Sequence, residues 1–223
     1  GYEQGPQKNY NRLLTTYLNY NKDFAAINSS LDVTLGYDYQ FWRNSGPAYP
    51  TFDDAGNQTN ISTPWDNRHT LISYYGRVNY SYDSRYLLTA TFRRDGSSRF
   101  AKDQRWGTFP SLALAWRVAQ EKFFEPIRTV MNDLKLRASY GITGQQDGIT
   151  DYGYIPNYTG SLEGAYYPID GVWRPTFRPQ AYNDKLKWET TKSWNFGLDF
   201  GFLNSRLSGS VEYFTRKTRD LLA

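Results

Sequence analysis

The stretch "LKWETTKSWNFGLDFGF", residues 186–202, sorts its side chains into two kinds at alternate positions. In a β-strand, alternate side chains point to opposite faces. One face is polar throughout, and the other becomes apolar and aromatic toward its C-terminal end, through Trp194, Phe196, Leu198, Phe200 and Phe202. An average strand has only about 5–6 residues. The stretch therefore predicts an unusually long strand with one apolar and one polar face.

The same alternation recurs along the rest of the chain. One example is the stretch 31–43, where Leu31, Val33 and Leu35 alternate with Asp32 and Thr34. Turn signals separate the segments that share this pattern. Besides 186–202, they are residues 11–21, 31–43, 70–82, 85–94, 107–118, 134–143 and 205–217. The sequence thus predicts about eight long antiparallel strands, each paired with its neighbour along the chain.

The predicted connections alternate in length. Compact links lie near residues 22–30, 83–84, 119–133 and 203–204, and we expect one short helix within 120–133. Between them fall links at 44–69, 95–106 and 144–185, two of which are very long. Short turns on one side and long loops on the other are typical of outer-membrane barrels. The predicted fold class is all-β, an antiparallel up-and-down transmembrane β-barrel of which this chain supplies about eight strands.

Composition agrees with a barrel wall. Mean hydropathy is −0.73 and 22% of residues are charged, but only half of each barrel strand faces lipid, so the average is hydrophilic. Aromatic residues make up 18% of the chain, and Tyr and Trp suit membrane interfaces and sugar-binding sites. Basic residues are scattered despite the net charge of +4, which excludes a nucleic-acid footprint.

Candidate chemical groups are few. Cysteine is absent and His69 is the single histidine, which we expect to be a polar residue at the start of a strand. Asp53–Asp54 reads as part of a solvated loop. The stretch "RRDGSSRF" at 93–100 reads as a structural loop, with Asp95–Gly96 as its hairpin signal. We therefore predict no catalytic residue, no cofactor and no metal site.

The long link after residue 144 is rich in aromatic residues. Exposed rings at this density can stack on sugars or on a partner protein, and the alternative is that they pack the loop against its neighbours. The candidates for ligand or partner contact are Tyr154, Tyr158, Tyr166, Tyr167 and Trp173.

Three blocks carry a family resemblance. They are "YLLTATFRRDGSSRFAKDQRWGTFPSLALAWRVAQEKFF" at 86–124, "LKLRASYGITGQQ" at 134–146 and "LKWETTKSWNFGLDFGFLNSRLSGSVEYFTRKTRDLL" at 186–222. In the residues of these blocks and in their order along the chain, the sequence resembles the SusC/RagA family of TonB-linked outer membrane proteins of Bacteroidetes. Residues 1–69 resemble the family only in general character.

The resemblance implies a 22-stranded barrel in the bacterial outer membrane, closed by an N-terminal plug. A SusD-like surface lipoprotein would cover it, and the TonB complex would drive import of glycans or peptides (an oligosaccharide or peptide ligand). Residues 1–223 would then be part of a single barrel domain in contact with outer-membrane lipid. We expect the plug, the TonB-box segment and the signal peptide to lie outside this chain.

Two other readings stay open from the residues alone. The first is a complete small eight-stranded outer-membrane barrel with a structural or adhesive role. The second is a soluble β-rich carbohydrate-active enzyme, which would need a pair of well-placed carboxylates. No motif nominates such a pair.

Overall fold

The computed structural model describes residues 6–49, 51–57, 64–160, 166–179 and 182–222. Its main feature is one antiparallel sheet in which every strand pairs with its neighbour among the long strands, in the order β1-β2-β3-β4-β5-β6-β11-β12. The eight strands are β1 (Lys8–Phe24), β2 (Ser29–Gly46), β3 (Trp65–Tyr82), β4 (Tyr86–Ser97), β5 (Trp106–Arg117), β6 (Met131–Gln145), β11 (Glu189–Phe202) and β12 (Leu207–Arg219).

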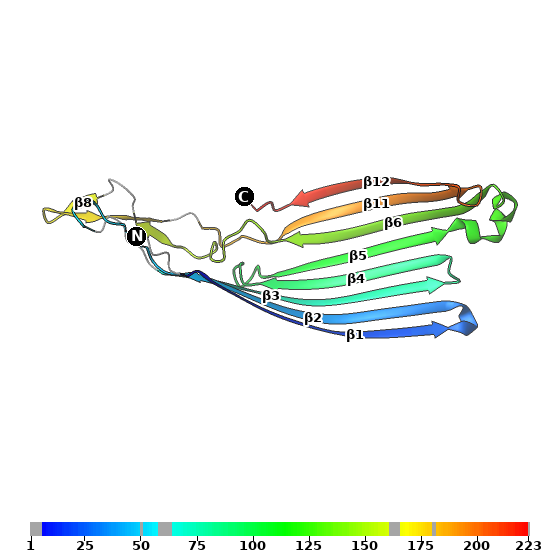
Figure 1. The fold of residues 1–223 in the computed structure, drawn as a ribbon, viewed down its shortest axis with the longest axis horizontal. Coiled ribbons are helices and arrows are strands. Elements are labelled where there is room, and N and C mark those ends of the chain that lie inside the picture. Colours follow the sequence, from blue (N-terminus) through cyan, green and yellow to red (C-terminus); the bar gives the residue numbers. More distant parts are fainter. Residues whose placement is uncertain (1–5, 50, 58–63, 161–165, 180–181, 223) are drawn as a thin grey trace.

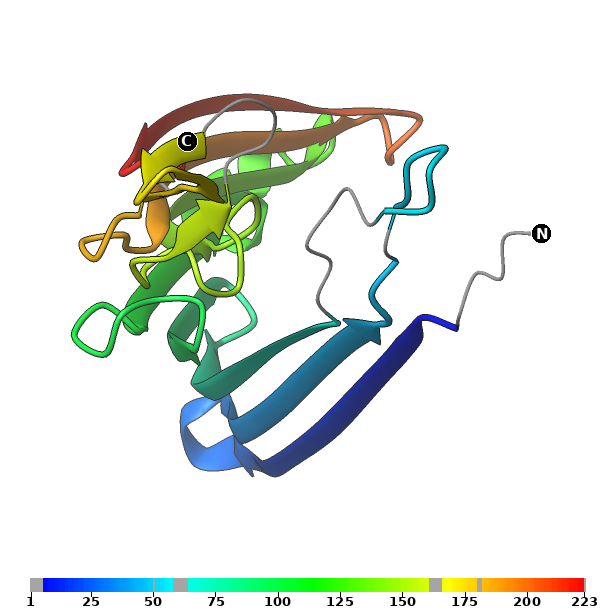
Figure 2. The same ribbon diagram turned by 90° about the vertical axis from the view of Figure 1, so that its left-hand side faces the viewer.

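The sheet is curved and open. Viewed along the strands it curls into a trough, with β1 and β12 as its two free edges (Figure 2). The two edge strands each have one partner, and they do not pair with each other. These eight strands therefore do not close on themselves, which argues against the complete small barrel.

The connections alternate between the two ends of the sheet (Figure 1). At one end, called here the turn end, lie the links β1–β2, β3–β4, β5–β6 and β11–β12. At the other, the loop end, lie the links after β2, β4 and β6. The last of these contains two small two-stranded sheets, in which β7 (Tyr158–Gly160) pairs with β10 (Phe177–Pro179) and β8 (Tyr166–Ile169) pairs with β9 (Val172–Pro175). The predicted alternation of turns and loops is confirmed.

Strand register sorts the side chains into two faces. Trp194 lies opposite Tyr140, Phe196 opposite Ala138 and Leu198 opposite Leu136, so the predicted apolar positions of adjacent strands coincide. Residues directly opposite each other share a face. We call the face with these residues the apolar face, and the one with Asn195 and Asp199 the polar face.

Several predicted boundaries were wrong. Strand β3 begins at Trp65, so His69 lies inside a strand and not at its start. Asp95 and Gly96 pair on both sides, with β3 and β5, and the hairpin loop comes after Ser97. Residues 186–188 precede the strand, which starts at Glu189.

The compact links also differ in detail. Two 3-10 helices, Val118–Gln120 and Lys122–Ile127, replace the one helix expected within 120–133, and the first begins before that range. Pro126 lies in the second helix, where its missing N–H is compatible with only a short turn. The last hairpin turns through four residues, 203–206, of which Leu203, Asn204 and Ser205 have positive φ. None of the helices in the described residues has the length and apolar character needed to cross a membrane.

Candidate functional site

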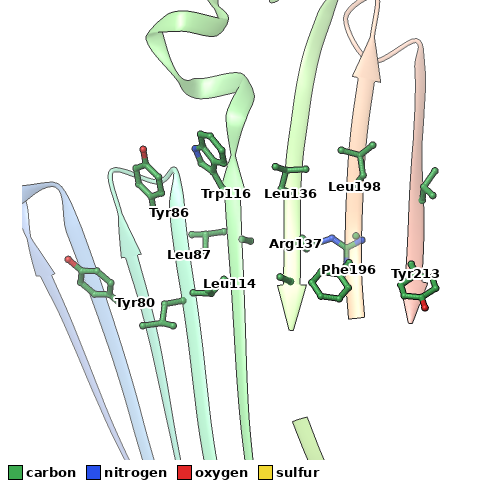
Figure 3. A pocket seen from close by; sticks show the side chains of 15 residues that line it. Tyr80, Tyr86, Leu87, Leu114, Trp116, Leu136, Arg137, Phe196, Leu198 and Tyr213 are labelled. Atoms are coloured by element: carbon green, nitrogen blue, oxygen red, sulfur yellow. The ribbon is translucent and has the colours of Figure 1, made fainter. Parts of the chain in front are cut away.

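The apolar face is uncharged along its middle. On β11 it runs through Trp194, Phe196, Leu198, Phe200 and Phe202, all with apolar or aromatic neighbours on β6. An open hollow of about 820 Å³ lies on this side near the turn end, lined by Leu114, Trp116, Leu136, Phe196, Leu198 and other residues (Figure 3). An open apolar surface of this kind suits hydrocarbon chains and offers few partners to a polar ligand.

The polar face carries an ion network across β6, β11 and β12. The guanidinium of Arg137 donates to both carboxylate oxygens of Asp199, at 2.8 and 2.9 Å, and to Glu212 Oε1 at 2.7 Å. Gly197 lies beside it, and a Cβ there would come within 2.9 Å of the Arg137 guanidinium carbon. The glycine therefore leaves the space that lets one arginine bridge three strands. Two-pronged contacts of this type fix the arginine in one orientation.

At the loop end, the polar face holds a cavity of about 390 Å³. Strand register places two rows of side chains beneath it: Asn9, Asn44 and Asn67 face one another across β1, β2 and β3, and Asn11, Trp42 and His69 form the next row. The Trp42 and His69 rings stack with centroids 4.5 Å apart. Arg99 and Asp151 also line the cavity. Amide side chains both donate and accept hydrogen bonds, so the lining offers partners of both kinds to a polar group.

The long loop after β6 is anchored over this cavity. Asp151 accepts a hydrogen bond from Arg99 Nε at 2.9 Å, and its Oδ1 lies 3.1 Å from His69 Nδ1. The backbone N–H of Arg68 donates to Tyr152 Oη at 3.2 Å. These contacts tie the start of the loop to β3 and to the β4–β5 connection, which the sequence did not predict.

A small aromatic core anchors the other end of the loop. Phe100, Phe109 and Trp188 form one buried cluster, and Trp188 Nε1 donates to the carbonyl of Arg105 at 2.9 Å. The pairing of β5 with β6 covers only Ser111 to Arg117, so the upper part of β5 has no partner on that side. The Phe109 ring lies against Gly144 of β6 there, where a Cβ would be 2.0 Å from its Cζ.

The five predicted contact residues do not converge on one site. Tyr154 lies in a turn and is half-buried, whereas Tyr158 of β7, Tyr166 and Tyr167 of β8 and Trp173 of β9 are exposed. In the β8–β9 hairpin, Tyr167 lies opposite Arg174 and Trp173 opposite Pro168, so Tyr167 and Trp173 are on different faces. This hairpin lies far from the sheet at the loop end (Figure 1).

The acidic candidates have local structural roles. Asp53 accepts hydrogen bonds from the backbone N–H and side-chain amide of Asn57, at 2.7 and 3.0 Å, which lowers the pKa of Asp53 from its usual value. Asp54 is exposed in the same turn. Within the described parts of the chain, no group of three His, Cys, Asp or Glu residues is placed to hold a metal ion.

Comparison with known proteins agrees with this two-faced sheet. The sequence profile of the family described as "TonB dependent receptor-like, beta-barrel" matches residues 1–223. The chain is 45% identical over 222 residues to "TonB-dependent receptor SusC" of Bacteroides thetaiotaomicron, covering 97% of this chain and 22% of that protein. It is 39% identical over 225 residues to "TonB-dependent receptor P3" of Formosa agariphila, covering 95% of this chain and 22% of that protein.

Solved structures show the same fold. The "RagAB peptide importer in the 'open-open' state" superimposes with a TM-score of 0.78 and 25% identity, over 97% of this chain and 24% of that one. The siderophore receptor PirA from Acinetobacter baumannii superimposes with a TM-score of 0.61 at 13% identity, over 96% of this chain and 28% of that one, which is a likeness of fold alone.

These findings define the class as the wall of a bacterial outer-membrane β-barrel. The chain belongs to the TonB-dependent receptor β-barrel family, and within it to the SusC/RagA type. Members of this family are bacterial outer-membrane proteins, which contradicts the soluble location that the enzyme alternative assumed. The chain spans about a fifth of the length of the curated relatives it matches.

Proposed function

We propose that residues 1–223 form one section of the wall of a single TonB-dependent barrel domain that imports glycans or peptides. The apolar face contacts lipid, and the polar face lines the lumen. The observation that carries this is the separation of the faces: uncharged aromatic and aliphatic residues on one, and the Arg137–Asp199–Glu212 network on the other.

The loop end is then extracellular and receives the ligand. The cavity above the Asn9–Asn44–Asn67 row lies on the polar face of β1 to β3, at the entrance to the lumen. Its amides and the Trp42 ring suit a ligand with many hydroxyl or amide groups. Import requires binding and release only, so the segment needs no residue for covalent chemistry.

Two partners belong to this function. A SusD-like surface lipoprotein covers the loop end and contacts the exposed aromatic residues Tyr158, Tyr166, Tyr167 and Trp173, with Tyr154 at the base. Tyr and Trp supply large contact areas at low entropic cost. The TonB complex supplies the energy through parts of the receptor beyond this segment.

Uptake measurements test this proposal. In cells that depend on the full-length receptor, we expect accumulation of labelled oligosaccharide or peptide that stops when the TonB complex is inactivated. Uptake that persists without TonB would contradict energised import. A hydrolytic activity lost on a single substitution within this segment would contradict the non-enzymatic assignment.

A further inference from the structure

Charges on the apolar face are arranged asymmetrically between its two ends. Each strand can be followed along the apolar face from its apolar residues toward the loop end. On six of the eight strands, the first charged side chain in that direction is basic. In β4 the order is Phe92 then Arg94, and in β11 it is Trp194 then Lys192. The six residues, called here the basic belt, are Arg12, Arg43, Arg68, Arg94, Lys192 and Lys217.

Register confirms that the belt belongs to the apolar face. Arg12 lies opposite Phe41, Arg94 opposite Tyr74, and Lys192 opposite both Ile142 and Lys217. All six side chains are exposed. At the turn end the same face carries Lys22 on β1, whereas β4, β5 and β11 end there in Tyr86, Trp116 and Phe202.

Most of the belt lacks carboxylate partners. Asp66 is the acidic residue on this face at the loop end, and it pairs with Arg43 and Arg68. In the described chain, no carboxylate forms an ion pair with Arg12, Arg94, Lys192 or Lys217.

Aromatic rings lie against Arg12 and Arg94, the two belt arginines without a carboxylate partner among the described residues. The Arg12 guanidinium lies 4.9 Å from the Tyr10 ring centroid, and that of Arg94 lies 5.3 Å from the centroid of Trp106. Trp106 in turn stacks on Tyr74. Tyr and Trp rings concentrate where hydrocarbon meets headgroups, and long basic side chains extend their charges into that layer. The belt therefore lies at the depth of lipid headgroups on the loop side.

We propose that the basic belt binds the phosphate groups of phosphorylated glycolipids in the outer leaflet of the outer membrane. Four of the six belt cations have no carboxylate partner in the described chain, and cations spaced around the wall at headgroup depth match an anionic lipid surface. The near absence of cations at the turn end of this face makes the preference specific to the outer leaflet. The inference rests on the proposed orientation, with the apolar face in lipid and the loop end outside the cell, and it is independent of what the receptor imports.

Lipid titration of the purified full-length receptor tests the proposal. The probes are bisphosphorylated lipid A and the same lipid after dephosphorylation, with bound lipid counted by native mass spectrometry. The belt variant combines Arg12→Gln, Arg94→Gln, Lys192→Gln and Lys217→Gln, which leaves the Asp66 pairs intact. The matched control removes four exposed positive charges off the apolar face, with Lys102→Gln, Lys122→Gln, Arg174→Gln and Arg206→Gln.

We expect the belt variant to need at least about tenfold more bisphosphorylated lipid A for half-saturation, because each basic side chain near an anionic lipid surface contributes about a factor of five. The control should bind as the unmodified receptor does, and dephosphorylated lipid should bind weakly to all three. Equal affinity of belt variant and control would overturn the proposal. So would equal binding of the two lipids, or no binding by the unmodified receptor. Should the fourfold variant fail to assemble, Arg94→Gln and Lys192→Gln tested singly decide the same question.

Discussion

At the scale of single residues, two nearby positions of β11 require side chains of opposite polarity. Leu198 lies on the apolar face opposite Leu136 and Val211. Asn195, three residues earlier, lies opposite Ser139 on the polar face, which also carries the Arg137–Asp199 pair between β6 and β11. The chemistry tolerated at each position therefore depends on the face more than on the strand.

Arginine substitution at these two positions gives a direct comparison. We expect Leu198→Arg to destabilise the folded barrel by about 2–4 kcal/mol, because it places a charge near the bilayer midplane. Asn195→Arg should reduce the free energy of unfolding far less, because its face contacts water. Urea unfolding of the two full-length variants, followed by heat-modifiable gel migration, measures the difference. Equal losses would contradict the assignment of faces.

Glu121 is a second residue with a clear expectation, and it lies outside the membrane-spanning strands. Its carboxylate accepts hydrogen bonds from Tyr86 Oη at 2.6 Å, Trp116 Nε1 at 3.0 Å and Arg85 Nη1 at 2.8 Å. These partners, Tyr86 and Trp116 first, lower the pKa of Glu121 below its usual value. The charged form is therefore favoured in the folded state.

The sign of the pH dependence follows. A carboxyl whose pKa is lowered by folding contributes stability above its unfolded pKa, which is about 4.3 for glutamate, and loses it as pH falls through the lowered folded value. We expect Glu121→Gln to reduce the unfolding midpoint at pH 7 and to flatten its decline below about pH 4. Glu125→Gln, exposed in the same connection, is the control. An unchanged acid limb in Glu121→Gln would refute this role.

At the scale of elements, side-chain alternation alone located all eight long strands and their pairing order. It underestimated the loop end of β3, because Asp66, Asn67 and Arg68 make both faces polar there and the periodic signal disappears. For β11 it placed the loop end three residues too early, at 186 in place of Glu189. It also misassigned Asp95–Gly96. That pair is a common turn signal, but pairing with both β3 and β5 holds it in extended conformation.

The contact network was less accessible from sequence. Arg137 and Asp199 could each be placed on the polar face by parity, but their meeting depends on the register of β6 with β11. The short strands β7 to β10 have only three or four residues each, too few for a period to be recognised. The anchoring of the loop by Asp151 joins residues 52 positions apart, beyond any local pattern.

The junction between β5 and β6 gives an element-scale prediction. Gly144→Ala would place a methyl 2.0 Å from Phe109 Cζ and displace that ring from Trp188. We expect a loss of about 1–3 kcal/mol, typical of overpacking, and faster proteolysis within residues 146–188. Gly76→Ala is the control, because its nearest neighbour is the Leu35 side chain at 3.2 Å, which is exposed and can move. Equal protease sensitivity of the two variants would rule out this anchoring core.

At the scale of the whole molecule, the long loop is separable from the wall. The backbone N–H of Asn183 donates to the carbonyl of Gly153 at 3.1 Å, so the two ends of the inner loop lie side by side. Excision of residues 156–182 with a two-glycine link therefore spares the anchors Asp151, Tyr152 and Trp188. It removes four of the five aromatic contact candidates.

We expect this excision to reduce co-purification of the lid lipoprotein or uptake of ligand while barrel assembly survives. We expect the same loss of lid binding or uptake when serine replaces Tyr158, Tyr166, Tyr167 and Trp173 together and the backbone stays intact. Undiminished lid binding and uptake in both variants would remove the loop from the mechanism.

The separation of the sheet into a lipid face and a lumen face is the central claim, and spin labels test it most directly. The chain has no cysteine, so single cysteines can be introduced one at a time along the apolar run, from residue 194 to residue 202. They would be placed in a cysteine-free full-length receptor in lipid bilayers and labelled, and collision with oxygen and with a water-soluble nickel complex would be measured. We predict a period of two, with even positions exposed to oxygen and odd positions to nickel. Uniform accessibility, or the reverse assignment of even and odd positions, would contradict the account.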